Sequence, residues 1–236
     1  MFDVDLDRLP RDVDLPPAAY VSRPEAAPYF VPNVWPEQPT ALRAVWTEYY
    51  RALERLASDL MRTFAVGLGL PEMFFADKID KHITRMRAID YPAPARAALP
   101  GQLRSGAHSD YGSLTILRIE DAPGGLEVFN RRREWVAVKA VPAGFVVNLG
   151  DLMANWTNDR WVSTLHRVVN PEPDLALGSR RQSLVYFHQP NYDAIIECLP
   201  SCQGPGNPPQ YPPITSGEHR RRKFAKTVMS RSASDS

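Results

Sequence analysis

Five short segments rich in β-branched and aromatic residues constrain the fold of this chain most strongly. They are Leu114–Ile119, Trp135–Val138, Phe145–Leu149, Leu165–Val169 and Ser183–Phe187, separated by turn residues such as Pro123–Gly125 and Asn170–Pro171. Short strands at this spacing are typical of an all-β sandwich or barrel. No helical stretch long enough for a parallel crossover lies between them. We therefore predict a mainly β protein with antiparallel strands and flanking helices.

The residues before these strands fall into two parts. Residues 1–40 are rich in proline, which excludes long helices and central strands and predicts an extended arm. From Leu42 to Phe64, apolar residues recur at spacings of three and four, which predicts an amphipathic helix. Thr40 is positioned to cap the start of this helix, and Gly67–Gly69 would end it.

The composition excludes some classes of partner. The 28 Lys and Arg residues nearly balance the 27 Asp and Glu residues, so no overall field would attract nucleic acid or an anionic membrane. No apolar run approaches the roughly 20 residues of a membrane-spanning helix, and the acidic N-terminus does not resemble a signal peptide. We expect a cytoplasmic protein. Cys198 and Cys202 are expected to be reduced thiols rather than zinc ligands.

Two histidines and one aspartate form the strongest chemical signal. His108 and Asp110 are two residues apart, so on an extended strand their side chains point to the same face. His166 lies in a later strand-like run, which an antiparallel sandwich can bring opposite. Two imidazoles and one carboxylate leave coordination positions open, as Fe(II) requires to bind an organic acid and dioxygen. Taken singly, each histidine is better explained as a hydrogen-bonded core residue, so the surrounding segments decide.

Those segments resemble a known family. In order along the chain, the matching segments are Gly101–Leu117, Gly124–Val128, Val147–Met153, Trp156–Val168 and Arg180–Ser183. They are similar to segments of the Fe(II)/2-oxoglutarate-dependent oxygenases of the isopenicillin N synthase type. The resemblance extends from about Ile83 to Pro213, more than half of the chain. It implies a double-stranded β-helix, also called a jelly roll, which is a cupin-like fold.

The resemblance also assigns residues to roles. It implies that His108, Asp110 and His166 hold Fe(II), and that Arg181 and Ser183 receive the distal carboxylate of 2-oxoglutarate. The chemistry agrees, because a guanidinium binds a carboxylate through two parallel hydrogen bonds. Tyr91 occupies the place of a family tyrosine that contacts the same cosubstrate, although Ile89 replaces the asparagine of that motif.

The implied reaction is oxidation of a small-molecule substrate, by hydroxylation, desaturation or cyclisation. Dioxygen would be consumed, succinate and CO2 would be released, and secondary metabolism is the common setting of the family. Two alternatives stay open. The first is an Fe(II) oxidase of the same fold that does not use 2-oxoglutarate, because such enzymes share the Arg-x-Ser element. The second is a jelly-roll binding module without catalysis.

We expect one structural domain with four parts. Residues 1–40 would form the arm, 41–82 a helical segment packed on the barrel, 83–215 the jelly-roll core, and 216–236 a basic helix and a disordered tail. Family members usually carry several dozen residues before the segment that matches this chain from Phe2. A naturally short chain, a start assigned late and a wall supplied by a partner subunit are all compatible with this difference. A homodimer is therefore one hypothesis.

The C-terminal region has a readable pattern but no substrate code. Gly217–Val228 predicts a short basic helix, and Ser230–Ser236 a frayed tail. The run Arg220–Lys223 could attract an anionic substrate, but a solvated helix face is the better explanation.

Other residues have structural explanations. His82 lies in a charged stretch and is expected at the surface, whereas His188 could line the pocket but is not assigned to the metal. Alternation along the last strand places Phe187 on the interior face with Arg181, and Arg180 on the solvated face. We expect packing roles for Trp156 and Trp161, and turn or ligand-supporting roles for Asn148 and Asp151.

Overall fold

The structure is a computed structural model that describes residues 3–4, 33, 35–94, 96, 98–175 and 179–234. Its helices are α2 (Leu42–Gly67), α3 (Ala76–Ile79), α4 (Asp151–Trp156) and α5 (Ser216–Ser234), with 3-10 turns at Pro173–Leu175 and Pro200–Cys202. Its strands are β1 (Asp3–Val4), β2 (Arg85–Tyr91), β3 (Leu103–His108), β4 (Leu114–Ile119), β5 (Gly125–Phe129), β6 (Trp135–Ala137), β7 (Val146–Leu149), β8 (His166–Val169), β9 (Arg181–His188), β10 (Ile195–Ile196) and β11 (Ile214–Thr215).

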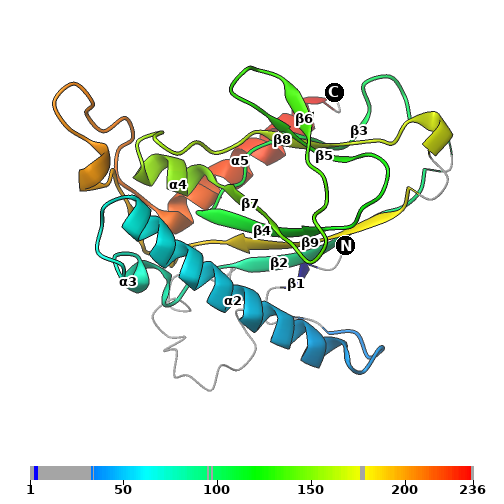
Figure 1. Ribbon diagram of the computed structural model, residues 1–236, viewed down its shortest axis with the longest axis horizontal. Coiled ribbons are helices and arrows are strands. Elements are labelled where there is room, and N and C mark those ends of the chain that lie inside the picture. Colours follow the sequence, from blue (N-terminus) through cyan, green and yellow to red (C-terminus); the bar gives the residue numbers. More distant parts are fainter. Residues whose placement is uncertain are drawn as a thin grey trace.

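The strands form two facing antiparallel sheets. One has the order β1-β2-β9-β4-β7 and the other β3-β8-β5-β6, while β10 and β11 make a small separate pair. Successive strands from β2 to β9 alternate between the two sheets, apart from the hairpin of β5 and β6 (Figure 1). This winding is a double-stranded β-helix, so the predicted fold class is confirmed. All five segments predicted as strands are present, as β4, β6, β7, β8 and β9.

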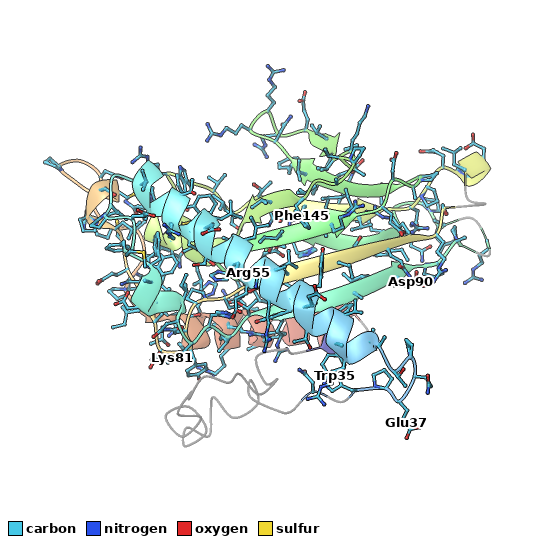
Figure 2. All side chains as sticks on the ribbon, turned by 60° about the horizontal axis from the view of Figure 1, so that its bottom comes forward. Trp35, Glu37, Arg55, Lys81, Asp90 and Phe145 are labelled. Carbon is cyan, nitrogen blue, oxygen red and sulfur yellow. The ribbon has the colours of Figure 1, made fainter. Side chains whose placement is uncertain are left out.

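Helix α2 covers the outer face of the five-stranded sheet. Its buried residues, Tyr50, Leu53, Ala57, Met61 and Ala65, follow the spacing of three and four seen in the sequence. They pack on Met86, Ile116 and Tyr186, whose side chains share the outer face of β2, β4 and β9. Figures 1 and 2 show the helix lying across this sheet. The main hydrophobic core therefore lies outside the barrel, between α2 and the sheet.

The start of α2 differs from the prediction. The helix begins after Ala41, and no side chain caps it, so the prediction that Thr40 is the cap is wrong. Its end at Gly67 agrees with the predicted stop. Most of the proline-rich arm lies outside the described residues. Within it, β1 pairs with β2 at the edge of the sheet, a position that a short strand can take in a proline-rich segment.

The two cysteines belong to the same core. Cys198 and Cys202 are both buried, and both are free thiols. This environment agrees with the predicted reduced state. Among the described residues, no helix is both long and apolar enough to cross a membrane.

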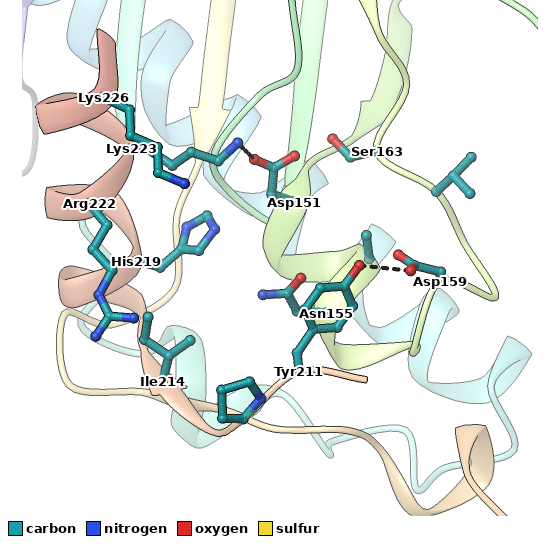
Figure 3. Close-up of a pocket in the computed structure, with 13 residues that line it drawn as sticks. Asp151, Asn155, Asp159, Ser163, Tyr211, Ile214, His219, Arg222, Lys223 and Lys226 are labelled. Atoms are coloured by element: carbon teal, nitrogen blue, oxygen red, sulfur yellow. Dashed lines mark hydrogen bonds and ion pairs between the residues drawn. The ribbon is translucent and has the colours of Figure 1, made fainter. Parts of the chain in front are cut away.

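Helix α5 is held beside α4 by charged and polar contacts. Lys223 Nζ lies 2.5 Å from Asp151 Oδ2, and the two helices border a cavity of about 560 Å³ into which His219 projects (Figure 3). Burial lowers the pKa of His219 from its usual 6.5 to about 4. The helix runs to Ser234, so the predicted tail is wrong up to that residue. Residues 235–236 lie outside the described part.

The packing of α2 predicts which of its residues stabilise the fold. Met61 is fully buried against the sheet, whereas the Val66 side chain is 60% exposed on the same helix. We expect Met61→Ala to lower the free energy of unfolding by about 2–5 kcal/mol, because it leaves a cavity in the core. Val66→Ala should change it by less than about 0.5 kcal/mol. Urea unfolding followed by circular dichroism measures both, and equal losses would contradict this account of the core.

The partly buried His219 predicts a pH dependence of stability. Its pKa in the folded protein is about 4 and its usual value is 6.5, so between these values the unfolded chain binds more protons. Stability should therefore fall as the pH drops from about 6.5 to about 4, by up to about 3 kcal/mol from this residue. His219→Gln should lose correspondingly less stability over that range in urea unfolding. Parallel pH profiles for the variant and the original protein would refute this role.

Candidate metal centre

Strands β3 and β8 bring the predicted metal ligands together. His108 ends β3 and lies directly opposite His166, the first residue of β8, with ring centroids 4.3 Å apart. Asp110 follows two residues after β3 and is 5% exposed. Ligand atoms of the three side chains all lie within 4.8 Å of one another. The register of two neighbouring strands thus assembles residues that are far apart in sequence.

Backbone hydrogen bonds orient both imidazole rings. Nδ1 of His108 lies 2.8 Å from the carbonyl oxygen of Gly106, and Nδ1 of His166 lies 3.0 Å from that of Thr164. A carbonyl oxygen can only accept, so each Nδ1 is assigned as the protonated donor. The Nε2 lone pair of each ring is therefore available to a metal ion, an arrangement that recurs in histidine metal sites.

The carboxylate of Asp110 is oriented in the same way. Its Oδ2 accepts hydrogen bonds from Thr115 Oγ1 and Asn148 Nδ2, each at 2.7 Å. Its Oδ1 faces the histidines, 3.6 Å from His166 Nε2. The supporting role expected of Asn148 agrees with this contact. Thr115 was not singled out by the sequence pattern, although a hydroxyl between two buried apolar residues of a strand is the signal that could have identified it.

The donor set fits Fe(II). Two imidazole nitrogens and one carboxylate oxygen lie close together, and His108 and Asp110 also line a cavity of about 210 Å³. Such a facial arrangement of two histidines and one carboxylate is typical of iron sites that keep positions open for other ligands. His108 is exposed, so the site can be reached from solvent.

A buried arginine forms a second polar site inside the barrel. Arg181 on β9 is 2% exposed and lies opposite Tyr91 on β2, with its guanidinium carbon 5.7 Å from the tyrosine ring centre. Its Nε has no hydrogen-bond partner, and no carboxylate forms an ion pair with it within the part of the chain that the structure describes. Burial lowers the pKa of Arg181. A buried cation without an acidic partner is costly, which indicates a place for an anion.

The surroundings of Arg181 suit a carboxylate. Ser183 is buried two residues along the same strand, on the same face. Burial raises the pKa of Tyr91, so its hydroxyl keeps the proton that it can donate. A Cβ built on Gly125 would overlap Nη1 of Arg181, so only glycine leaves room for the guanidinium there. The sequence pattern explained Gly125 only as a turn residue.

The cavity beside the triad has a basic and aromatic lining. Besides the triad residues His108 and Asp110, its lining includes Arg85, Arg87, Tyr111, Phe187, Arg220 and Phe224. Phe187 faces the interior, as predicted from strand alternation. Arg220 is 5% exposed, so placing the whole run Arg220–Lys223 on a solvated face is wrong for this residue. Its neighbours Arg221 and Arg222 do lie on the exposed face, where both pair with Glu218.

Two further histidines, His82 and His188, lie away from the metal cavity. His82 is 6% exposed and bonded to Glu54 Oε1 of α2 at 2.8 Å, so the prediction of a surface position is wrong. Buried His188 contacts Ser113 Oγ at 2.6 Å and does not line the metal cavity. Its burial holds the pKa of His188 well below the usual value. His82 therefore links α2 to the segment before β2, and neither side chain belongs to the metal cavity.

Three further predictions about individual residues agree with the structure. The Arg180 side chain is 64% exposed and pairs with Asp90 at 3.0 Å. Trp156 packs on Phe75, and Trp161 packs edge-on against Phe64.

The contacts of Asp110 predict that Thr115 supports metal binding. Thr115→Val removes one donor to Oδ2 while keeping the shape of the side chain, whereas Thr115→Ser keeps the hydroxyl. We expect the valine variant to bind Fe(II) about tenfold to a hundredfold more weakly, because the carboxylate loses part of its orientation. Anaerobic calorimetric titration measures this affinity. Equal affinities of the two variants would show that the hydroxyl has no such role.

Comparisons with known proteins identify the family of this chain. The profile of the 2OG-Fe(II) oxygenase superfamily matches residues 81–190. The 2-oxoglutarate-Fe(II) type oxidoreductase hxnY of Emericella nidulans is 36% identical over 80% of this chain and 56% of its own length. This chain therefore spans little more than half of that relative.

Solved structures give the same result. A full-length Neurospora crassa protein, crystallised in complex with alpha-KG, has a TM-score of 0.77 and 34% identity, over 83% of this chain and 61% of that one. A Caulobacter crescentus protein assigned to the 2OG-Fe(II) oxygenase family has a TM-score of 0.79 and 30% identity, over 91% of this chain and 67% of that one. Sequence and fold together show that the chain belongs to the 2OG-Fe(II) oxygenase superfamily.

Proposed function

We propose that this protein is an Fe(II)- and 2-oxoglutarate-dependent oxygenase that oxidises a small organic molecule. One observation carries the proposal. A facial set of two histidines and one aspartate opens into a cavity, and the same barrel contains a buried arginine without an acidic partner among the described residues. A metal-binding protein without catalysis would have no reason to keep both features inside one barrel.

The residues of the two sites are proposed to bind the metal and the cosubstrate. His108, Asp110 and His166 would hold the ion through Nε2, Oδ1 and Nε2, because hydrogen bonds occupy their other polar atoms. Arg181 would bind the distal carboxylate of the cosubstrate, with Ser183 and Tyr91 beside it. When bound, iron with 2-oxoglutarate and dioxygen supplies the oxidation and releases succinate and CO2. Phe187 and the other aromatic walls help to exclude water from the cavity.

The substrate is proposed to be a small molecule of secondary metabolism, altered by hydroxylation, desaturation or cyclisation. The size of the cavity, about 210 Å³, supports a small substrate rather than a macromolecule. A homodimer is part of the same proposal. Its support is the edge of the five-stranded sheet, where Val147 of β7 and Phe145 just before that strand (Figure 2) are each 41% exposed.

Anaerobic titration tests the two binding sites separately. Fe(II) with 2-oxoglutarate should produce a weak visible charge-transfer band in the original protein and none in His166→Ala. Arg181→Gln should need roughly tenfold to a hundredfold more 2-oxoglutarate for the same band, because charged hydrogen bonds contribute about 1.5–3 kcal/mol. Arg180→Gln is the matched control, since the Arg180 side chain is exposed on the opposite face. No band in the original protein, or equal effects of the two arginine variants, would contradict the proposal.

Succinate release separates this proposal from the oxidase alternative. With Fe(II), 2-oxoglutarate, dioxygen and an accepted substrate, the protein should form succinate in proportion to oxidised product. Product formation without succinate would instead establish an oxidase that does not use 2-oxoglutarate.

A further inference from the structure

We propose that the substrate of the metal cavity is an organic acid, in which a carboxylate is joined to a flat apolar body. This inference rests on the proposed function and names the class of its substrate. Its basis is the lining of the cavity, where three arginines and three aromatic residues lie together with the metal ligands His108 and Asp110.

Two of the arginines come from β2. Arg85 lies opposite Phe187 on β9 and Arg87 lies opposite Val185, so both share the interior face that also carries Arg181 at its far end. Both belong to the lining of the metal cavity, whereas Arg181 does not. The barrel therefore has two basic regions along one row of strand positions. The distal region suits the cosubstrate, and the region beside the triad suits a different anion.

The third arginine comes from α5. Arg220 is 5% exposed, and its Nη1 donates a hydrogen bond to the carbonyl oxygen of Ile83 at 3.2 Å. Phe224, one turn further along the helix, also faces the cavity. The Lys223–Asp151 ion pair holds this helix against α4 (Figure 3). The guanidinium of Arg220 is thus fixed in the wall of the cavity by packing on both sides of the helix.

The charge of the lining favours an anionic ligand. Asp110 is the one carboxylate among the described residues that line the cavity, and a bound ion would engage it. Arginine forms paired, parallel hydrogen bonds with a carboxylate. The three guanidinium groups offer hydrogen-bond donors and no acceptors, so this lining favours a carboxylate over an amine.

The aromatic residues favour a flat apolar body. The Arg220 guanidinium lies 5.6 Å from the ring centre of Phe224, and that of Arg87 lies 6.0 Å from the ring centre of Phe187. Tyr111 meets Phe224 edge-on, with ring centres 5.7 Å apart. Ring faces beside guanidinium groups form a slot that accepts a planar group next to its acid. The volume of about 210 Å³ limits the ligand to a small molecule.

Matched acids and amides test the inference on the full chain. The probes are benzoate, phenylacetate and 3-phenylpropionate, each compared with its neutral amide by calorimetry. We expect at least one acid to bind the protein, loaded with Fe(II) and saturating 2-oxoglutarate under anaerobic conditions, about tenfold or more tightly than its amide. The preference for the acid should persist in the metal-free protein. That measurement reports binding to the cavity independently of the proposed oxidation.

Three variants locate the preference. Arg220→Gln and Arg87→Gln should each weaken binding of the acid about tenfold and leave the affinity for 2-oxoglutarate unchanged. Arg87→Gln covers the case in which loss of buried Arg220 prevents folding. Arg221→Gln is the control, because this neighbouring arginine is exposed, pairs with Glu218 and does not line the cavity.

Several results would overturn the inference. These are failure of all three acids to bind, equal binding of acids and amides, an equal effect of Arg221→Gln, or displacement of the acid by 2-oxoglutarate. Failure of the proposed function would give a different result. The original protein would then show no charge-transfer band, but the metal-free protein would still bind the acid.

Discussion

The antiparallel register of β2, β9 and β4 is the constraint on which the rest of the structure depends. It sets Phe187 opposite Arg85 and Thr115, so the side chains that line the metal cavity and support Asp110 lie in one row across the sheet. A slip of one residue along β9 would turn Arg181 and Phe187 towards α2. The same slip would bring the outer-face residues of that strand into the barrel, so both sites would be lost together.

The two faces of this sheet have different tasks. The outer face is apolar, and its contact with α2 forms the main core of the protein. The inner face carries charged and polar groups, among them Arg181 and Ser183, which add little stability when they are buried. Because the apolar contact lies outside the barrel, the interior can keep groups that are unfavourable without a ligand. Stability and binding are therefore separated by strand alternation.

Much of the fold and of the triad could be predicted from the sequence, because both depend on short-range patterns. Strand alternation predicted that His108 and Asp110 act together, and they do, although β3 ends at His108 and Asp110 lies just beyond it. The spacing of three and four marked α2. The errors arose where the partner comes from elsewhere in the chain. His82 looked exposed among charged neighbours, but Glu54 of α2 covers it. The pattern of α5 could not show that Arg220 of its basic run is buried in the wall of the cavity.

The sequence by itself determined the chemistry of this protein: which residues can bind iron, which can bind a carboxylate, and which segments form strands. These follow from side-chain type and local spacing. Only the tertiary structure decided how these groups combine. It left Arg181 without an acidic partner among the described residues, used Thr115 and Asn148 to turn Asp110 towards the histidines, and placed α5 over the metal cavity. Those outcomes depend on contacts between distant segments, because burial and orientation are set by packing across the barrel.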